Sequence, residues 1–218
     1  MPFIGKKDAL HIAQKLKVEI IHNMAVAEGS QLSFAETKTL IENGITSNSC
    51  STFDVEQALR LNRAFDEIIH QIQHNTFVLN KDNFIKINQL IAENEALNVG
   101  SFRYSQVSVG DYMPPRCEEL DTLFIKMIDD FNHKSDSEEK ASDLFLDSAR
   151  NQYFFDGNKR TAQMMMNGFL ISNGYCPRTI QRENINEYNQ KMYAFYPTND
   201  KKAMYEFLEK IASKAVYI

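Results

Sequence analysis

The sequence of 218 residues has no tryptophan, and it is poor in proline, glycine and cysteine, with 5, 8 and 3 residues of these types. Scarce glycine and proline favour a helical protein with few sharp turns. Cys50, Cys117 and Cys176 lie far apart, form no CxxC pair and are odd in number. This pattern argues against a disulfide framework and favours free thiols in a reducing compartment, so we expect a cytoplasmic protein.

Long apolar runs are missing as well. No stretch of ~18 apolar residues is present, which argues against a membrane-spanning helix. Residues 1–14 lack the apolar run of a signal peptide. The net charge is −5, so no general positive field attracts nucleic acid or an anionic membrane, and we expect neither as a partner. Any phosphate site must therefore be built locally.

The length and an apolar content of 43% predict a single globular domain over residues 1–218. Apolar residues recur at the spacing of amphipathic helices. The expected helices are residues 6–27, 34–42, 54–73, 82–94, 117–131, 138–151, 158–173, 185–196 and 201–213. Ser33 suits the N-cap of the second helix, and Gly44 suits its end.

Between Asn98 and Pro115 the helical spacing disappears. Gly100, Gly110 and the two prolines 114–115 bracket a segment with alternating apolar residues. This alternation predicts a short β-hairpin.

The segment 154–160, with the sequence FFDGNKR, joins the end of one expected helix to the start of the next. The backbone N–H groups of Gly157, Asn158 and Lys159 would point out of that helix start, where the helix dipole is positive. Such a helix start binds anions, and Arg160 could grip a phosphate with two hydrogen bonds. The sequence therefore predicts a nucleotide-binding loop formed by Gly157, Asn158, Lys159 and Arg160.

Asp156 offers the oxygen ligand that Mg²⁺ prefers when it bridges phosphates. On spacing alone, an ordinary helix–turn–helix with a DGN turn and solvated basic residues is an equal alternative.

The loop resembles the signature of the Fic (cell filamentation, Fic-Doc) family, His-x-Phe-x-(Asp/Glu)-Gly-Asn-(Gly/Lys)-Arg. The matching residues are Phe154, Asp156, Gly157, Asn158, Lys159 and Arg160. The resemblance implies an all-α helical bundle, the Fic fold, with a short β-hairpin flap and a core over residues 35–180. Residues 102–110 correspond to the flap, where a protein target would dock by strand addition. The resemblance leaves open whether the protein forms a homo-oligomer.

The resemblance also implies an activity. Fic enzymes use ATP and Mg²⁺ to move AMP onto a protein hydroxyl, and their motif histidine accepts the proton of that hydroxyl. Asp156 and Arg160 would be catalytic residues, with Asp156 the ligand of Mg²⁺.

The histidine position of the motif is Gln152 in this sequence. An amide has no usable basicity, whereas imidazole has a pKa near the working pH, and losing a general base costs about 10²–10⁴-fold in rate. His133 is the nearest histidine in sequence. His70 and His74 stand four residues apart, but without further ligands nearby a helix surface explains them better than a metal site.

Two more positions depart from the usual pattern. A second arginine, which in many members contacts the γ-phosphate, is replaced by Gln163. Lys159 occupies a position that is glycine in most adenylylating members and lysine in the Doc branch, which transfers the γ-phosphate. Three hypotheses follow: a weakened adenylyltransferase, a binding protein without turnover, and a Doc-like phosphotransferase.

A regulatory residue is also suggested. Some Fic proteins carry an autoinhibitory helix with the pattern (Ser/Thr)-x-x-x-Glu-(Gly/Asn), and residues 39–44, TLIENG, resemble its end. Glu42 would be the inhibitory acid. The residue four positions earlier is Lys38, so the match is partial, and Gln163 removes the arginine with which such an acid pairs.

Several apolar residues border the loop. Tyr153 and Phe155 flank it and could stack on a base, whereas Phe154 is expected to anchor it in the core. The three methionines at 164–166 have the helical spacing of core residues.

Overall fold

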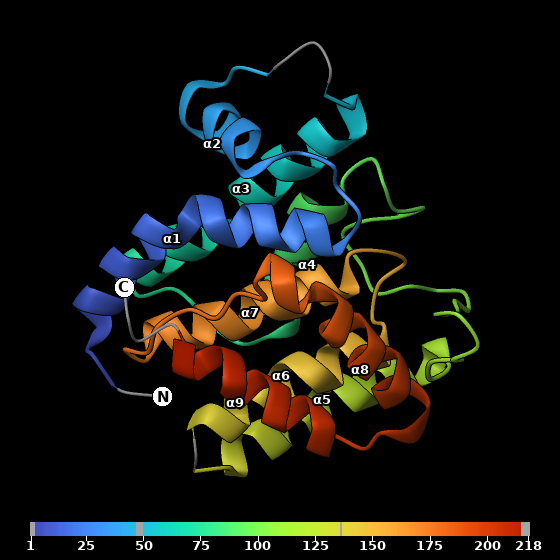
Figure 1. The fold of residues 1–218 in the computed structure, drawn as a ribbon. Helices are drawn as coiled ribbons and strands as arrows, with labels where there is room; N and C mark the ends of the chain where they lie inside the picture. The colour runs from blue at the N-terminus through green and yellow to red at the C-terminus, as the bar shows by residue number, and fades with distance from the viewer. Residues whose placement is uncertain (1–2, 47–49, 136, 215–218) are drawn as a thin grey trace.

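The computed structural model describes residues 3–46, 50–135 and 137–214, and the arrangement is helical (Figure 1). The α-helices are α1 (Lys6–Ala27), α2 (Phe34–Asn43), α3 (Thr52–Gln73), α4 (Lys81–Ala92), α5 (Leu120–His133), α6 (Ser137–Asn151), α7 (Asn158–Ser172), α8 (Ile185–Thr198) and α9 (Lys202–Lys214). Short 3₁₀ turns at Cys117–Glu119 and Arg182–Asn184 precede α5 and α8. The helices predicted from apolar spacing are all present.

Local signals explain where the helices begin and end. The Ser33 side chain accepts a hydrogen bond from the Glu36 N–H, and Glu36 bonds back to the Ser33 N–H, so α2 starts with a full capping box. Gly44 ends α2 in a left-handed conformation with φ 69°. Both cap predictions are confirmed.

Helix α7 is the central element. It packs against α1, α3, α4 and α6, and Figure 1 shows these helices around it. Because it is covered on all sides, nearly every side chain of α7 is buried. The methionines at 164–166 lie in this core, as predicted. The loop at the start of α7 is thus fixed on a rigid element.

Residues 98–116 differ from the prediction. No strand forms among the described residues of this segment, so the β-hairpin flap is not seen. One antiparallel bridge joins Val109 and Tyr112, whose backbone N–H and C=O groups bond at 3.0 and 3.1 Å. The segment is therefore a loop closed by one tight turn.

Side chains hold the two arms of this loop where a ladder was expected. Arg103 donates to the carbonyls of Ser105 and Pro115, and Gln106 Nε2 donates to the carbonyl of Pro114 at 2.8 Å. The two prolines at 114–115 lack N–H groups and cannot donate to a ladder. The alternating apolar residues therefore lie in a loop whose arms are joined by side chains, and the predicted strand pairing does not form.

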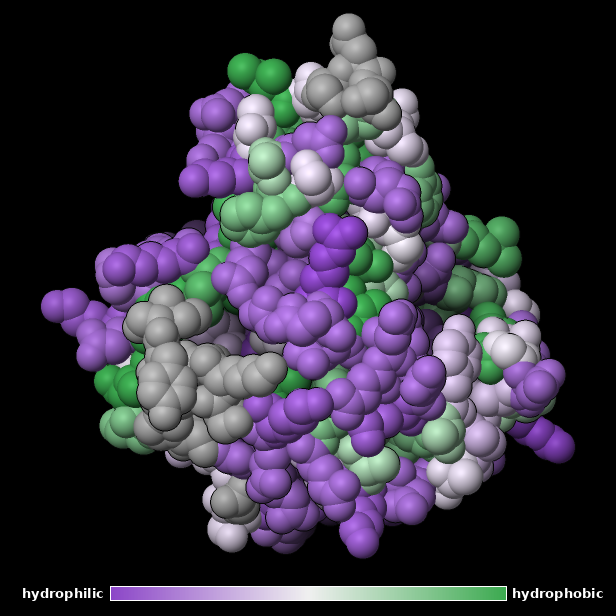
Figure 2. All heavy atoms as spheres, viewed as in Figure 1, coloured by the Kyte–Doolittle hydropathy of each residue, from purple (hydrophilic) through white to green (hydrophobic). Residues whose placement is uncertain are grey.

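The outer surface is mostly polar. Figure 2 shows hydrophilic residues over most of the visible face, with hydrophobic residues in separate patches. Within the described ranges, no helix is both long and apolar enough to cross a membrane.

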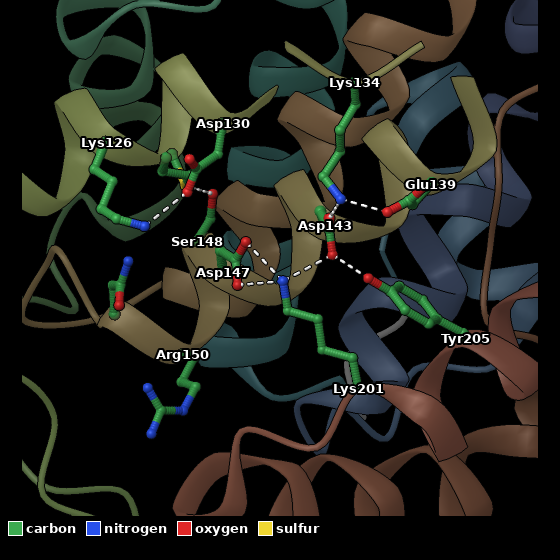
Figure 3. A network of polar contacts seen from close by, with 12 residues as sticks. Lys126, Asp130, Lys134, Glu139, Asp143, Asp147, Ser148, Arg150, Lys201 and Tyr205 are labelled. Atoms are coloured by element: carbon green, nitrogen blue, oxygen red, sulfur yellow. Dashed lines mark hydrogen bonds and ion pairs between the residues drawn. The ribbon is translucent and has the colours of Figure 1, made fainter. Parts of the chain in front are cut away.

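A charged network ties α9 to the rest of the fold (Figure 3). Lys201, just before α9, lies 2.7 Å from Asp143 and 2.7 Å from Asp147 on α6. Lys134 lies 2.5 Å from the other oxygen of Asp143, and the Tyr205 hydroxyl also donates to Asp143. Asp143 is buried, so it is the centre of this network.

Replacing Asp143 with Asn should lower the free energy of unfolding by about 2 kcal/mol at pH 7, because the partly buried Lys134 and Lys201 would lose their shared carboxylate and keep only Glu139 and Asp147 as partners. Burial alone would raise the pKa of Asp143, but hydrogen bonds from Lys134, Lys201 and Tyr205 bring it below the ordinary value of 3.8. A lowered pKa stabilises the fold above pH 3.8, and this stabilisation is lost as the pH falls below it. The difference between wild type and variant should therefore shrink in acid.

Urea unfolding at pH 7 and in acid measures the loss of stability in the variant and its dependence on pH. Asp130→Asn is the control, since Asp130 forms an exposed pair with Lys126. Burial raises the pKa of Asp147, which affects stability with the opposite sign, and the charge of Asp143 adds to this rise, so the variant loses that added part. A variant as stable as the control, or a gap independent of pH, would contradict this account.

Candidate functional site

The loop between α6 and α7 has a constrained backbone. Gln152 and Gly157 have φ angles of 48° and 74°. A Cβ at residue 157 would lie 3.1 Å from Asn88 Nδ2 and 3.1 Å from Ile91 Cγ2, so a side chain there would press on α4 and would also be strained at this positive φ. Asn88 Nδ2 also donates to the Asp156 carbonyl at 2.9 Å. Helix α4 thus holds the loop from behind.

Asn158 braces the loop from within. Its Oδ1 accepts from the Phe154 N–H at 2.9 Å, and its Nδ2 donates to the Phe154 carbonyl at 2.8 Å. The same Nδ2 donates to Gln152 Oε1 at 2.9 Å. The Asn158 side chain is therefore occupied by the loop, which leaves its backbone N–H as the group for an anion.

Gln152 is buried, and both ends of its amide are used. Nε2 donates to the Ala149 carbonyl at 2.6 Å, while Oε1 accepts from Asn158. Arg103 Nε donates to the Gln152 carbonyl at 2.6 Å, which ties the 98–116 loop to this residue. Gln152 acts as a structural brace at this position.

The N-terminus of α7 opens into a pocket of about 230 Å³. Gly157 is the N-cap, and its N–H donates to Asp156 Oδ1. Among the described residues no side chain bonds the N–H groups of Asn158 and Lys159, which therefore keep their capacity to bind an anion. The lining residues are Glu28, Ser108, Val109, Gln152, Phe155, Asp156, Gly157, Asn158, Lys159, Arg160 and Tyr196. The structure thus brings all of the predicted loop residues to one pocket.

Arg160 is buried in a chain of charges. Its guanidinium lies 2.7 Å from Glu95 and 2.9 Å from Asp156, and Glu95 also pairs with Arg60. Burial alone would lower the pKa of Arg160, but the carboxylates of Glu28, Glu95 and Asp156 raise it above its usual value. Arg160 is therefore a fixed positive charge behind the pocket.

The acid that reaches the pocket is Glu28, at the end of α1. Glu28 Oε1 lies 2.9 Å from Lys159 Nζ, and both side chains are largely covered. Glu42 is exposed at the end of α2 and is not a lining residue. Sequence reasoning missed Glu28, although Glu28-Gly29 fits the Glu-(Gly/Asn) end of the inhibitory pattern; Met24 stands four residues earlier, where Ser or Thr is expected.

Residues 78–170, which hold the loop, match the model of the Fic/DOC family. The protein adenylyltransferase Fic of Aedes aegypti is 28% identical to the chain over 187 residues, covering 78% of this chain and 35% of that protein. The protein of the same name from Nematostella vectensis is 26% identical, covering 78% of this chain and 40% of its own length. The chain thus spans less than half of these relatives.

Solved structures have the same fold. Fic-1 residues 134–508 from C. elegans superpose with a TM-score of 0.83 at 17% identity, covering 94% of this chain and 64% of that one. A Fic-domain signalling protein from Bacteroides thetaiotaomicron gives a TM-score of 0.80 at 21% identity, covering 97% and 88%. The prediction of a helical Fic fold is confirmed.

The aromatic residues of the Fic loop separate into two groups. Phe154 is buried and anchors the loop, as predicted. Tyr153 is also buried and stacks on Phe102 with ring centres 4.8 Å apart, so the idea that Tyr153 stacks on a base is wrong. Phe155 is partly exposed and lines the pocket.

The histidines lie elsewhere. His133 is exposed, and its Nδ1 lies 2.8 Å from the Asp129 carbonyl. His70 and His74 are exposed with ring centres 4.2 Å apart, and the described residues contain no cluster of three or more metal-ligating side chains. None of these three histidines lines the Fic pocket.

The pocket fits Mg²⁺ only when a nucleotide carries it. Asp156 is half exposed, and its Oδ1 accepts hydrogen bonds from the Gly157 N–H and Arg160. A single carboxylate suits Mg²⁺ that takes its other ligands from phosphates and water. Asp156 would hold the ion there, and the ion would neutralise phosphate charge.

Proposed function

We propose that this chain is a Fic-type nucleotide-binding protein that transfers AMP from ATP to a protein hydroxyl only slowly. The open N-terminus of α7 in the pocket carries the proposal, because it offers unpaired backbone donors beside Lys159 and Arg160. The names of the relatives, protein adenylyltransferases, support this reaction class.

The lining residues would divide the work. The N–H groups of Asn158 and Lys159 would bind phosphate, and the Gly157 N–H would join them by leaving the Asp156 carboxylate. Arg160 would stabilise the charge that develops on the phosphate. Asp156 would hold Mg²⁺. Residues 102–110 would present a target hydroxyl, guided by the backbone of the loop that Arg103 secures.

Proton transfer is the weak step. Gln152 cannot accept a proton, and its amide is already bonded on both sides. Phosphoryl chemistry depends mainly on positioning and electrostatics, so slow transfer is still physically reasonable.

Two alternative functions are each supported by particular residues. Binding without turnover is supported by the neutral Gln152 and Gln163, since the Gln163 amide lies against the Tyr188 hydroxyl at 3.5 Å. Phosphotransfer of the Doc type is supported by Lys159.

We also propose that Glu28, in place of Glu42, is the regulatory acid of this pocket, because the Glu28 carboxylate pairs with Lys159. The free cysteines fit the proposed cytoplasmic location.

Labelled ATP tests the proposal. We expect saturable binding of ATP and Mg²⁺ by calorimetry, and slow transfer of label from α-³²P-ATP to protein over hours. Label from the γ position alone would identify phosphotransfer instead. Binding with no label from either position would favour the non-catalytic reading, and no binding would refute the proposed function.

A further inference from the structure

Tyr196, near the end of α8, brings an unsatisfied polar atom to the wall of the pocket. The residue lines the pocket and is 2% exposed, and its hydroxyl has no hydrogen-bond partner among the described residues. Most buried polar side-chain atoms in folded proteins have a partner, because leaving one without a partner is costly. This cost is offset if the hydroxyl acquires its partner when a ligand enters the pocket.

The ring of Tyr196 is held in place by two neighbours. It stacks on Tyr112 with ring centres 5.5 Å apart and an angle of 9° between the ring planes. Arg150 Nε donates to the Tyr196 carbonyl at 2.8 Å, and the Arg150 guanidinium lies 5.2 Å from the centre of the Tyr112 ring. A ring fixed in this way gives its hydroxyl a defined position, so this donor loses little entropy when a ligand binds.

The hydroxyl lies at the anion-binding end of the pocket and keeps its proton. Burial raises the pKa of Tyr196 above its ordinary value of 10, and the charge of Glu28 raises it further. Glu28 pairs with Lys159, whose backbone N–H belongs to the start of α7, so the hydroxyl lies near the expected phosphate. At neutral pH it is therefore an uncharged donor, and a phosphate oxygen is the acceptor that this end of the pocket suits.

We infer that Tyr196 is a further ligand-binding residue of this pocket, and that its hydroxyl donates a hydrogen bond to the phosphate of the bound nucleotide. The inference rests on the proposed nucleotide-binding function, and it adds a donor from α8, which lies beyond the matched residues 78–170. The hydroxyl is shielded from solvent in the free pocket, so a ligand must displace the side chains that cover it. The free protein is thus less stable than it could be, and the bound state gains affinity.

Tyr196→Phe keeps the stacked ring and removes only the hydroxyl. Calorimetry should show AMP binding at least about tenfold weaker in this variant than in wild type, the usual effect of losing a hydrogen bond to a charged group. Urea unfolding without ligand should give an unchanged or higher midpoint, because an unsatisfied buried atom is removed and no partner is lost. The ³¹P resonance of AMP bound at saturation should differ between the two proteins.

Tyr193→Phe is the matched control, because it removes the same hydroxyl from an exposed position on α8 outside the pocket. It should leave the AMP affinity, the urea midpoint and the ³¹P resonance unchanged. Equal AMP binding by wild type and Tyr196→Phe would overturn the inference, and so would a lowered midpoint, which would show that the hydroxyl has a partner within the protein. Weaker binding with an unchanged ³¹P resonance would place the hydrogen bond on the nucleoside and overturn the phosphate assignment. If wild type does not bind AMP, the proposed function itself fails, which is a separate outcome.

Discussion

Replacing Gln152 with histidine should raise the rate of adenylyl transfer by about 10²–10⁴-fold, the usual contribution of a positioned general base. Imidazole can accept the proton of a target hydroxyl near neutral pH, and the amide of Gln152 cannot. The backbone favours the change, because Gln152 has φ 48° and histidine tolerates positive φ better than most residues. Arg103 bonds only the backbone carbonyl of residue 152, so that contact survives.

Single-turnover transfer from α-³²P-ATP, with ATP affinity measured on the same samples, checks this prediction. ATP binding should change little, because the phosphate donors belong to residues 157–159. Gln152→Asn is the control, since it alters the same side chain without adding a base, and it should stay as slow as wild type. If the histidine variant transfers no faster than the Asn variant, the missing base does not limit the reaction.

Replacing Glu95 with Gln should lower the free energy of unfolding by about 3 kcal/mol. Glu95 is buried between Arg60 and Arg160, and its carboxylate pairs with both guanidinium groups. Removing one partner from a buried ion network leaves uncompensated charge, which is costly in a low-dielectric interior. Asp156 would still pair with Arg160, but it is half exposed and compensates only in part.

Urea unfolding compares this variant with Glu93→Gln. Glu93 pairs with Arg63 on the surface, with both side chains about half exposed, so its loss should cost little. Equal stability of the two variants would show that the Arg60–Glu95–Arg160 chain does not support the loop.

Helix positions could be read from the sequence because they depend on local signals. The apolar spacing of α1, α3 and α7 and the cap at Ser33 are set by residues within a few turns. The structure of residues 98–116 could not be read in this way. Whether a hairpin forms there depends on contacts between Arg103 and the segment of the two prolines, which lie 11 and 12 residues further along the chain. A side chain that bridges two arms leaves no periodic signal.

The site shows the same division. Gln152 and residues 155–160 line one pocket, and because they belong to one contiguous motif the sequence could place them together. Glu28 comes from α1, far away in the chain, and only packing brings it to Lys159. The sequence also did not predict the hydrogen bond from Asn158 to Gln152. Asn158 was expected to bind phosphate, but its side chain instead donates to a residue of the same loop.

The N-terminus of α7 should bind the phosphate of a nucleotide. Amide ¹H–¹⁵N shifts, recorded while the wild-type chain is titrated with AMP, detect this binding residue by residue. We expect saturable shifts that are largest for Gly157, Asn158 and Lys159. Unchanged amides at these three residues, with AMP either unbound or bound at another surface, would contradict it.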